Sequence, residues 1–173
     1  MKRLFESFPT NAKYCFYQTK VNQLLLVACD DYLRAILHSS NYEMDDFLSY
    51  GLKEDGSNTI LSKTSLQLDQ YVSGDRTEFD IPMFLEGTEF QQSAWKALTT
   101  IEYGKTISYQ DQAIRLGDAK KCRAVGMANG KNPISIIVPC HRVIAKNGNL
   151  QGYGGGLDMK QYLLDLEKAD CAI

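Results

Sequence analysis

Helix-start and helix-stop signals divide the second half of the chain into short helices, and they limit the folds that it can adopt. Thr88 and Gln91 have the spacing of a capping box, in which two side chains satisfy backbone N–H groups at the start of a helix. Ser108 and Asp111 repeat this pattern. Helices commonly end at glycine, and glycines follow at Gly104, Gly117 and Gly130. A further helix begins at Asp118, so two short helices joined by a tight turn predict a helix-turn-helix.

The remaining elements of this half are a buried segment, a turn and a final helix. Ile134–Val138 is a short apolar run that predicts a buried strand. Asn147 and Gly148 predict a tight turn, similar to the wing of a winged helix. Apolar residues recur at helical spacing in two segments, one from Thr88 to Gly104 and one near the C-terminus: Phe90, Ala94, Leu98 and Ile101, then Met159, Tyr162, Leu163 and Leu166.

The first half has the pattern of strands followed by one helix. Three short apolar runs, separated by polar turn residues, predict strands at Tyr14–Tyr17, Leu24–Ala28 and Tyr32–Leu37. A helix is expected through Leu61, Leu68 and Val72 up to Gly74, and a half-buried strand at Phe79, Ile81 and Met83. We therefore expect an α+β chain of two domains, a scaffold over residues 1–84 and a helical domain over residues 85–173.

Charge is distributed unevenly along a chain whose net charge is -2. Residues 1–80 contain 8 Lys and Arg against 12 Asp and Glu, whereas residues 103–148 contain 8 against 2. A basic surface on an acidic protein is typical of nucleic-acid binding, although a solvated basic face would give the same counts.

Cysteine usage and hydropathy indicate the compartment. The five cysteines are odd in number and scattered, which favours reduced thiols in the cytoplasm over a disulfide framework: Cys15, Cys29, Cys122, Cys140 and Cys171. No apolar run reaches the roughly 18 residues of a membrane span. Met1–Pro9 carries positive charge without an apolar run behind it, so no signal peptide is expected.

A proline, a cysteine and a histidine in succession form the densest chemical signal. Pro139 cannot donate to a sheet ladder, so it predicts the point where the strand leaves its sheet and Cys140 is presented. A thiol with a pKa near 8.5 is mostly protonated at neutral pH and needs a base. His141 can serve as that base if the chain bends between the two residues or if a water molecule bridges the thiol and the imidazole. Glu167 is a candidate to fix the tautomer of His141. Burial of Cys140 as a small apolar residue is the alternative.

The cysteine motif resembles the signature of the methylated-DNA–protein-cysteine methyltransferases, also called O-6-alkylguanine-DNA alkyltransferases. The resemblance covers about residues 87–167, and the first half more loosely. The matching segments are Gly87–Gln91, Trp95–Leu98, Ile107–Gln110, Arg123–Gly126, Asn132–Pro133, Pro139–Val143, Gly148–Leu157, Lys160, Leu163–Leu164 and Glu167. It implies a small ribonuclease H-like N-terminal domain with antiparallel strands and a C-terminal domain similar to a winged helix-turn-helix.

The resemblance also implies a direct-reversal repair reaction. The family flips O-6-methylguanine out of duplex DNA and transfers the alkyl group irreversibly to a cysteine, in a single turnover that consumes the protein. O-4-methylthymine is a further expected substrate. The expected partner is double-stranded DNA containing alkylated guanine. The protein is expected to be a cytoplasmic monomer that binds no membrane and needs no cofactor.

Family roles can be assigned to individual positions of this sequence. Cys140 corresponds to the alkyl acceptor, His141 to a base that acts through water, and Glu167 to the carboxylate that orients His141. Asn132 corresponds to the asparagine that braces the turn after the recognition helix. The expected pocket walls are Val143, Tyr153, Gly154 and Lys160, of which Lys160 would help to neutralise the pocket.

Four further residues are expected to contact DNA. Arg123 resembles the arginine that enters the base stack and fills the space of the extruded nucleotide. Tyr109 resembles the tyrosine that displaces the 3′ phosphate and donates to the leaving guanine. Gln110 and Lys146 are expected beside them. From the residues alone, Arg123 could equally be a solvated helix residue and Tyr109 a core aromatic.

Three alternatives remain to be weighed. Some family members bind a structural zinc in the N-terminal half, but Cys15, Cys29 and His38 are not spaced as a zinc site, so no metal is expected. An alkyltransferase-like lesion sensor would flip the base without repairing it, but such proteins replace the cysteine. A winged-helix transcription regulator would account for the helix-turn-helix, but it needs no cysteine, histidine and glutamate together.

Overall fold

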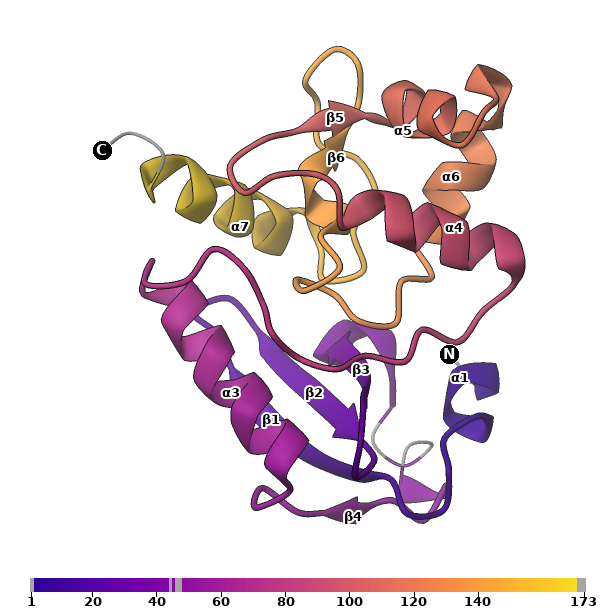
Figure 1. The fold of residues 1–173 in the computed structure, drawn as a ribbon. Coiled ribbons are helices and arrows are strands. Elements are labelled where there is room, and N and C mark those ends of the chain that lie inside the picture. The colour runs from indigo at the N-terminus through magenta and orange to yellow at the C-terminus, as the bar shows by residue number, and fades with distance from the viewer. Residues whose placement is uncertain (1, 44, 46–47, 171–173) are drawn as a thin grey trace. The chain divides into compact units, whose positions relative to one another are not determined.

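The computed structural model describes residues 2–43, 45 and 48–170, and the chain divides into two compact units, Met1–Glu86 and Gly87–Ile173 (Figure 1). Cys171 lies outside the described residues. Within the described part of the chain, no helix combines the length and the hydropathy that a membrane span requires. The predicted order, strands in the first half and helices in the second, is confirmed.

The first unit is built on a sheet with the strand order β3-β2-β1-β4. The strands β1 (Lys13–Gln18), β2 (Gln23–Ala28) and β3 (Leu33–His38) pair antiparallel, as expected. The short strand β4 (Lys53–Glu54) pairs parallel to β1. Helical elements that the structure describes in full in this unit are α1 (Lys2–Glu6), the 3-10 turn η1 (Ser39–Asn41) and α3 (Thr59–Val72).

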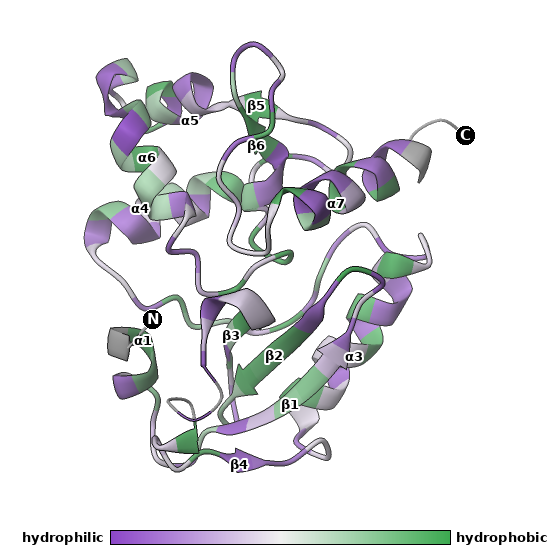
Figure 2. Cartoon of the chain, turned by 180° about the vertical axis from the view of Figure 1, so that it is seen from behind, coloured by the Kyte–Doolittle hydropathy of each residue, from purple (hydrophilic) through white to green (hydrophobic). Residues whose placement is uncertain are grey.

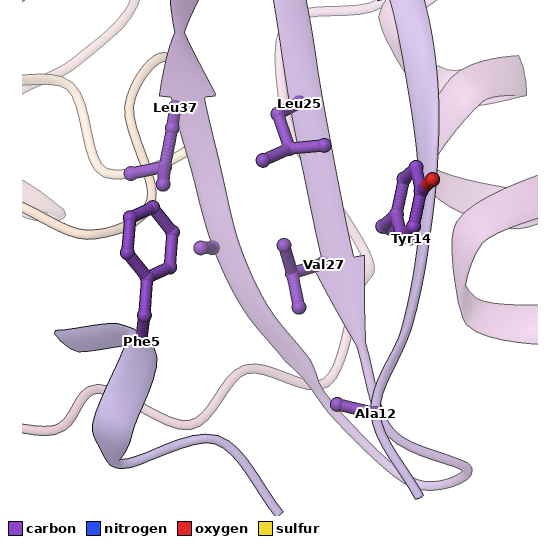
Figure 3. Close-up of a cluster of buried hydrophobic side chains, with 7 residues drawn as sticks. Phe5, Ala12, Tyr14, Leu25, Val27 and Leu37 are labelled. Atoms are coloured by element: carbon purple, nitrogen blue, oxygen red, sulfur yellow. The ribbon is translucent and has the colours of Figure 1, made fainter. Parts of the chain in front are cut away.

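The central strand β2 is apolar and buried from Leu24 to Ala28, after the exposed Gln23, and both faces of the sheet are covered there (Figure 2). One face packs with α1 in an aromatic-rich cluster made of Phe5, Ala12, Tyr14, Leu25, Val27, Ala35 and Leu37 (Figure 3). The other face meets α3, where the hydroxyl of Tyr17 donates to Asp69 at 2.8 Å. Successive strand residues point to opposite faces, so a continuous apolar run is what a strand covered on both faces needs.

The segment Phe79–Met83 does not form the predicted strand. It makes a single bridge, between Leu33 and Met83, although Ile81 is buried as the alternation suggested. Two features explain this. Pro82 has no N–H to donate to a ladder, and the N–H of Asp80 donates to the side chain of Gln67 at 2.9 Å instead of to a strand.

The second unit begins with α4 (Glu89–Leu98), whose N-terminus has the predicted capping box. The helix was expected to continue to Gly104, but it ends at Leu98, so that extension was wrong. The hydroxyls of Thr99 and Thr100 donate to backbone carbonyls of the last turn at 2.9 and 2.8 Å, which satisfies groups that a longer helix would have used. Ile101 is still buried, beyond the helix end.

A helix-turn-helix follows, as predicted. The strand β5 (Ile107–Ser108) leads into α5 (Tyr109–Arg115), whose N-terminus has the second capping box. The turn passes through Gly117, whose φ of 86° is the left-handed conformation that glycine adopts without strain. The 3-10 turn η2 (Ala119–Lys121) and α6 (Cys122–Asn129) complete the motif.

Buried polar contacts fix α6 against its neighbours. The amides of Gln112 on α5 and Asn129 on α6 donate to each other at 3.1 and 2.7 Å. The indole N–H of Trp95 on α4 donates to the carbonyl of Ala128 at 2.8 Å. Both pairs are buried, so their loss would leave polar groups without partners. The orientation of α6 is therefore set by hydrogen bonds as well as by packing.

The predicted strand at Ile134–Val138 is a buried turn instead. Ile136 has a φ of 73°, which is incompatible with a strand. The N–H of Val138 donates back to the carbonyl of Ile134 at 3.0 Å, so the segment closes on itself. Beyond it lie the 3-10 turn η3 (Cys140–Arg142), the strand β6 (Val143–Ile144), which pairs parallel to β5, and the helix α7 (Leu157–Asp170). The turn predicted at Asn147 and Gly148 is present, with Gly148 at a φ of 82°.

Candidate active site

Cys140 is the first residue of η3, directly after Pro139, and its side chain is buried. Pro139 therefore precedes a 3-10 turn and does not end a strand, which corrects the expected presentation of the cysteine. Burial raises the pKa of the Cys140 thiol, and a hydrogen bond from Asn132 and the charge of Lys160 oppose this effect. In the resting protein the thiol is therefore protonated at neutral pH.

Asn132 braces the turn that carries Cys140. Its side-chain oxygen accepts from the N–H of Ile134 at 3.0 Å, and its side-chain nitrogen donates to the carbonyl of Val138 at 2.7 Å. The same nitrogen lies 3.3 Å from the sulfur of Cys140 and donates to it. One buried amide thus closes the turn and contacts the thiol. A hydrogen bond to the sulfur favours the thiolate over the thiol.

Replacing Asn132 by alanine is expected to raise the pKa of the Cys140 thiol further, because the variant loses the hydrogen bond that favours the thiolate. The rate of Cys140 alkylation by iodoacetamide, followed by peptide mass, should shift to higher pH. Stability should fall by about 1–3 kcal/mol, because two buried backbone groups lose their partners. The exposed Asn149→Ala is the control. An unchanged pH profile in a folded Asn132→Ala protein would contradict this role.

His141 and Glu167 form a buried pair across η3 and α7. The Nε2 atom of His141 lies 2.9 Å from the Oε1 atom of Glu167, and both side chains are almost fully buried. Burial lowers the pKa of His141, and Glu167 opposes that shift. Because Glu167 is ionised, Nε2 carries the proton that it donates, which leaves Nδ1 as the basic nitrogen. Nδ1 is buried and makes no hydrogen bond with the described residues.

Arg142 holds Glu167 in its charged state, and the sequence reasoning gave it no role. Its guanidinium donates to both carboxylate oxygens, with Nε 3.0 Å from Oε2 and Nη2 2.9 Å from Oε1. Nη1 donates to the carbonyl of Ile101 at 2.6 Å, and the N–H of Gly104 donates to Oε2 at 3.1 Å. Burial would raise the pKa of Glu167, but His141 and Arg142 together lower it to about 2.

A signal for this role was present in the sequence. Arg142 lies beside Val143 and Ile144, in a segment that must be buried, and a buried guanidinium needs a charged or polar partner. Glu167 was already identified as a candidate for His141. The Glu167 carboxylate pairs with both His141 and Arg142, and the spacing of these residues in the sequence did not predict the shared partner.

Lys160 and Tyr109 both donate hydrogen bonds to the same backbone carbonyl, that of Gln151. The fully buried ammonium of Lys160 donates to the carbonyls of Val143 at 2.7 Å and Gln151 at 2.8 Å. The hydroxyl of Tyr109 donates to the same Gln151 carbonyl at 3.0 Å. Lys160 therefore ties the loop after β6 to the strand, in addition to placing a positive charge near Cys140.

Tyr153 lies edge-on to His141, with ring centroids 6.5 Å apart and an interplanar angle of 84°. Burial and the nearby Cys140 raise the pKa of the Tyr153 phenol well above its ordinary value, so the phenol stays neutral. Gly154 beside it is exposed. Val143 is fully buried in β6. Of the expected pocket walls, Tyr153 and Lys160 interact electrostatically with Cys140, and the place of Val143 and Gly154 in a pocket stays a prediction.

The expected DNA contacts other than Tyr109 lie on the surface. Arg123 is exposed near the start of α6. Lys146 and Gln110 are exposed, and the ammonium of Lys146 donates to the Gln110 side chain at 3.4 Å. Gln110 and Lys146 line a hollow of about 270 Å³ between α5 and the turn after β6. Within the described residues, no three His, Cys, Asp or Glu side chains gather as metal ligands.

Comparisons with known proteins place both units in one family. Residues 12–85 match the model of the 6-O-methylguanine DNA methyltransferase ribonuclease-like domain, and residues 89–169 match the model of the DNA binding domain of the same family. The predicted α+β fold class, with a ribonuclease-like first domain and a DNA-binding second domain, is therefore confirmed.

Curated relatives and solved structures agree with these models. The methylated-DNA–protein-cysteine methyltransferase of Methanosarcina acetivorans is 41% identical over 157 residues, which are 89% of this chain and 97% of that protein. The Mycobacterium bovis protein of the same name is 57% identical over 103 residues, 60% of this chain, and the match spans only 62% of that relative's length.

Two crystal structures from Mycobacterium tuberculosis share the fold. The O6-methylguanine methyltransferase aligns with a TM-score of 0.83 and 42% identity, over 92% of this chain and 94% of that chain. OGT in complex with DNA aligns with a TM-score of 0.83 and 41% identity, over 91% of this chain and 94% of that one. This chain belongs to the methylated-DNA–protein-cysteine methyltransferase family.

Proposed function

We propose that this protein repairs DNA by direct reversal, taking the alkyl group from O-6-methylguanine in double-stranded DNA and keeping it on Cys140. The observation that carries the proposal is the arrangement around the thiol. The Asn132 amide donates to the sulfur, and the adjacent His141 has its one basic nitrogen free within the described residues. The family membership and the DNA complex of a relative support DNA as the partner.

The first chemical step is removal of the thiol proton. Glu167 fixes the tautomer of His141, so that Nδ1 is the atom able to accept the proton, with a water molecule as carrier. Glu167 remains ionised throughout, because Arg142 and the N–H of Gly104 satisfy its oxygens. The imidazolium that forms is stabilised by this carboxylate. Arg142 acts here as a positioning residue, since it holds Glu167 and not the substrate.

The second step is displacement at the alkyl carbon. The sulfur of Cys140 forms a bond to the methyl carbon while the bond from that carbon to the guanine O-6 breaks. The electron pair of the broken bond passes into the guanine ring, which takes up one proton, equal to the one that the thiol gave to His141, and remains in the DNA as ordinary guanine. The thioether product has no hydrolytic exit, so each molecule reacts once. O-4-methylthymine presents the same alkyl–oxygen bond and is proposed as a second substrate.

Access requires that the damaged nucleotide leave the duplex, because Cys140 is only 8% exposed. Flipping costs a few kcal/mol, less for a damaged pair. We assign Arg123 to the space that the base vacates, and Gln110 and Lys146 to the DNA backbone. Tyr109 would give up its bond to the Gln151 carbonyl to donate to the leaving guanine. Val143, Tyr153, Gly154 and Lys160 would line the pocket.

We propose that the protein acts as a monomer, because one chain holds every residue that this mechanism uses. The reaction also needs Cys140 in its reduced form, which the cytoplasm maintains.

The stoichiometry of transfer tests the proposed function. With a large excess of duplex containing tritiated O-6-methylguanine, we expect one methyl group per protein molecule and no further release. Cys140→Ser should accept none, yet should still bind the duplex. Repeated turnover, or full transfer to Cys140→Ser, would contradict the proposal. Binding of the lesion by the unmodified protein without any transfer would identify it as a lesion sensor.

A further inference from the structure

Met127 on α6 is the most exposed large apolar side chain among the described residues, at 67%. Exposure of a single apolar side chain is common and by itself indicates nothing. The position of Met127 is what sets it apart, because it lies one helical turn after Arg123 on the same exposed face of the second helix of the helix-turn-helix.

The surface around Met127 is basic. No Asp or Glu occurs between Asp118 and Asp158, and Lys120, Lys121 and Lys131 are exposed at the two ends of α6. The segment that contains α6 therefore contributes positive charge and no carboxylate to this surface, which makes it complementary to a phosphate backbone. An exposed thioether within it is suited to contact the apolar parts of the same ligand, which are the faces of bases and the edges of sugars.

The geometry of α6 decides which side of the lesion Met127 would meet. An added Cβ on Gly126 would lie 3.8 Å from the Tyr109 ring, so the side of the helix at Gly126 faces that tyrosine. Helical residues advance by about 100°, which puts Gly126 and Met127 on opposite sides of Arg123 when the helix is viewed along its axis. Arg123 therefore lies between Tyr109 and Met127 around the helix surface.

We propose that Met127 is a second DNA-contacting side chain, which packs against the base pair flanking the extruded nucleotide on the side away from Tyr109. The inference rests on the proposed function and on duplex DNA as the ligand. Apolar side chains, methionine among them, stabilise distorted DNA by inserting at base steps. An unbranched thioether adapts to an irregular gap. Together, Arg123 and Met127 would keep the stack filled while the nucleotide is in the pocket.

The test compares Met127→Ala with Met127→Leu and with Leu66→Ala, whose side chain is 57% exposed on α3 in the first unit. Repair of methylated duplex by Met127→Ala should slow on the order of tenfold, as expected for burial of one methionine side chain. Met127→Leu should retain most of the rate, and Leu66→Ala all of it. Reaction with free O-6-benzylguanine should stay within about twofold, because a free base needs no extrusion.

Two further readouts separate this inference from the proposed function. In Cys140→Ser protein, fluorescence of 2-aminopurine beside the lesion reports extrusion without any transfer, and adding Met127→Ala should lower that signal. The salt dependence of duplex binding should keep its slope, because no charge is removed. Equal extrusion with and without Met127, or an equal loss on duplex and free base, would overturn the inference. Absence of transfer by the unmodified protein would overturn the proposed function instead.

Discussion

Replacing Arg142 by methionine is expected to lower the free energy of unfolding by about 3–5 kcal/mol at neutral pH, because it leaves a buried carboxylate without its charged partner. Glu167 is 1% exposed and accepts three of its hydrogen bonds from this guanidinium. Methionine keeps most of the apolar volume of the stem. The loss therefore comes from the stranded charge and from the Ile101 carbonyl, which also loses its donor.

Urea unfolding at two pH values checks both the size and the cause of this effect. The pKa of Glu167 is about 2, against 4.5 for an ordinary glutamate, so its pairing contributes stability above about pH 4.5 that is lost as the pH falls toward 2. The difference between the variant and the unmodified protein should therefore shrink at pH 3. Arg115→Met, at an exposed arginine, is the control. A change below about 1 kcal/mol at pH 7 would contradict the account.

Replacing Arg123 by alanine is expected to slow repair of duplex DNA on the order of 100-fold, while reaction with free O-6-benzylguanine stays nearly unchanged. The duplex reaction includes extrusion of the nucleotide, which costs a few kcal/mol, and each 1.4 kcal/mol is about tenfold in rate. Arg123 is exposed on α6, outside the buried cluster around Cys140, so its removal should not disturb the thiol.

Single-turnover rates on both substrates measure this difference. Lys120→Ala is the matched control, because Lys120 is an exposed cation in the turn before α6. This substitution should weaken duplex binding. It should also reduce by about one the slope of the logarithm of the binding constant against the logarithm of the salt concentration, with a much smaller effect on the rate at saturating DNA. Equal losses on duplex and free base would mean that Arg123 supports the site and does not act in extrusion.

Local rules predicted the elements whose signals lie within a few residues. Both capping boxes formed, because a Thr or Ser and a partner three residues later need only each other. The strands of the first unit formed where apolar runs were separated by polar turns. The strand predicted at Ile134–Val138 was wrong because the conformation of this segment depends on the side chain of Asn132, which forms hydrogen bonds with both of its ends. A short apolar run cannot reveal such a contact.

The site itself depends on contacts between residues distant in the chain. The sequence placed Cys140 and His141 together and offered Glu167 as a partner for His141, and the resemblance added Asn132. It did not reveal that Arg142 shares Glu167 with His141, or that Lys160 and Tyr109 both donate to the Gln151 carbonyl. These are tertiary hydrogen bonds, and their partners follow from how α7 packs beside η3, which no periodic pattern encodes.

The most direct test of the central claim is to locate the transferred methyl group. After reaction with methylated duplex, intact mass should increase by one methyl, and peptide mapping should place that methyl on Cys140. Cys15, Cys29 and Cys122 offer comparison thiols in the same digest, since all are free and less buried than Cys140. Methyl groups on those cysteines, with Cys140 unmodified, would contradict the assignment of Cys140 as the acceptor.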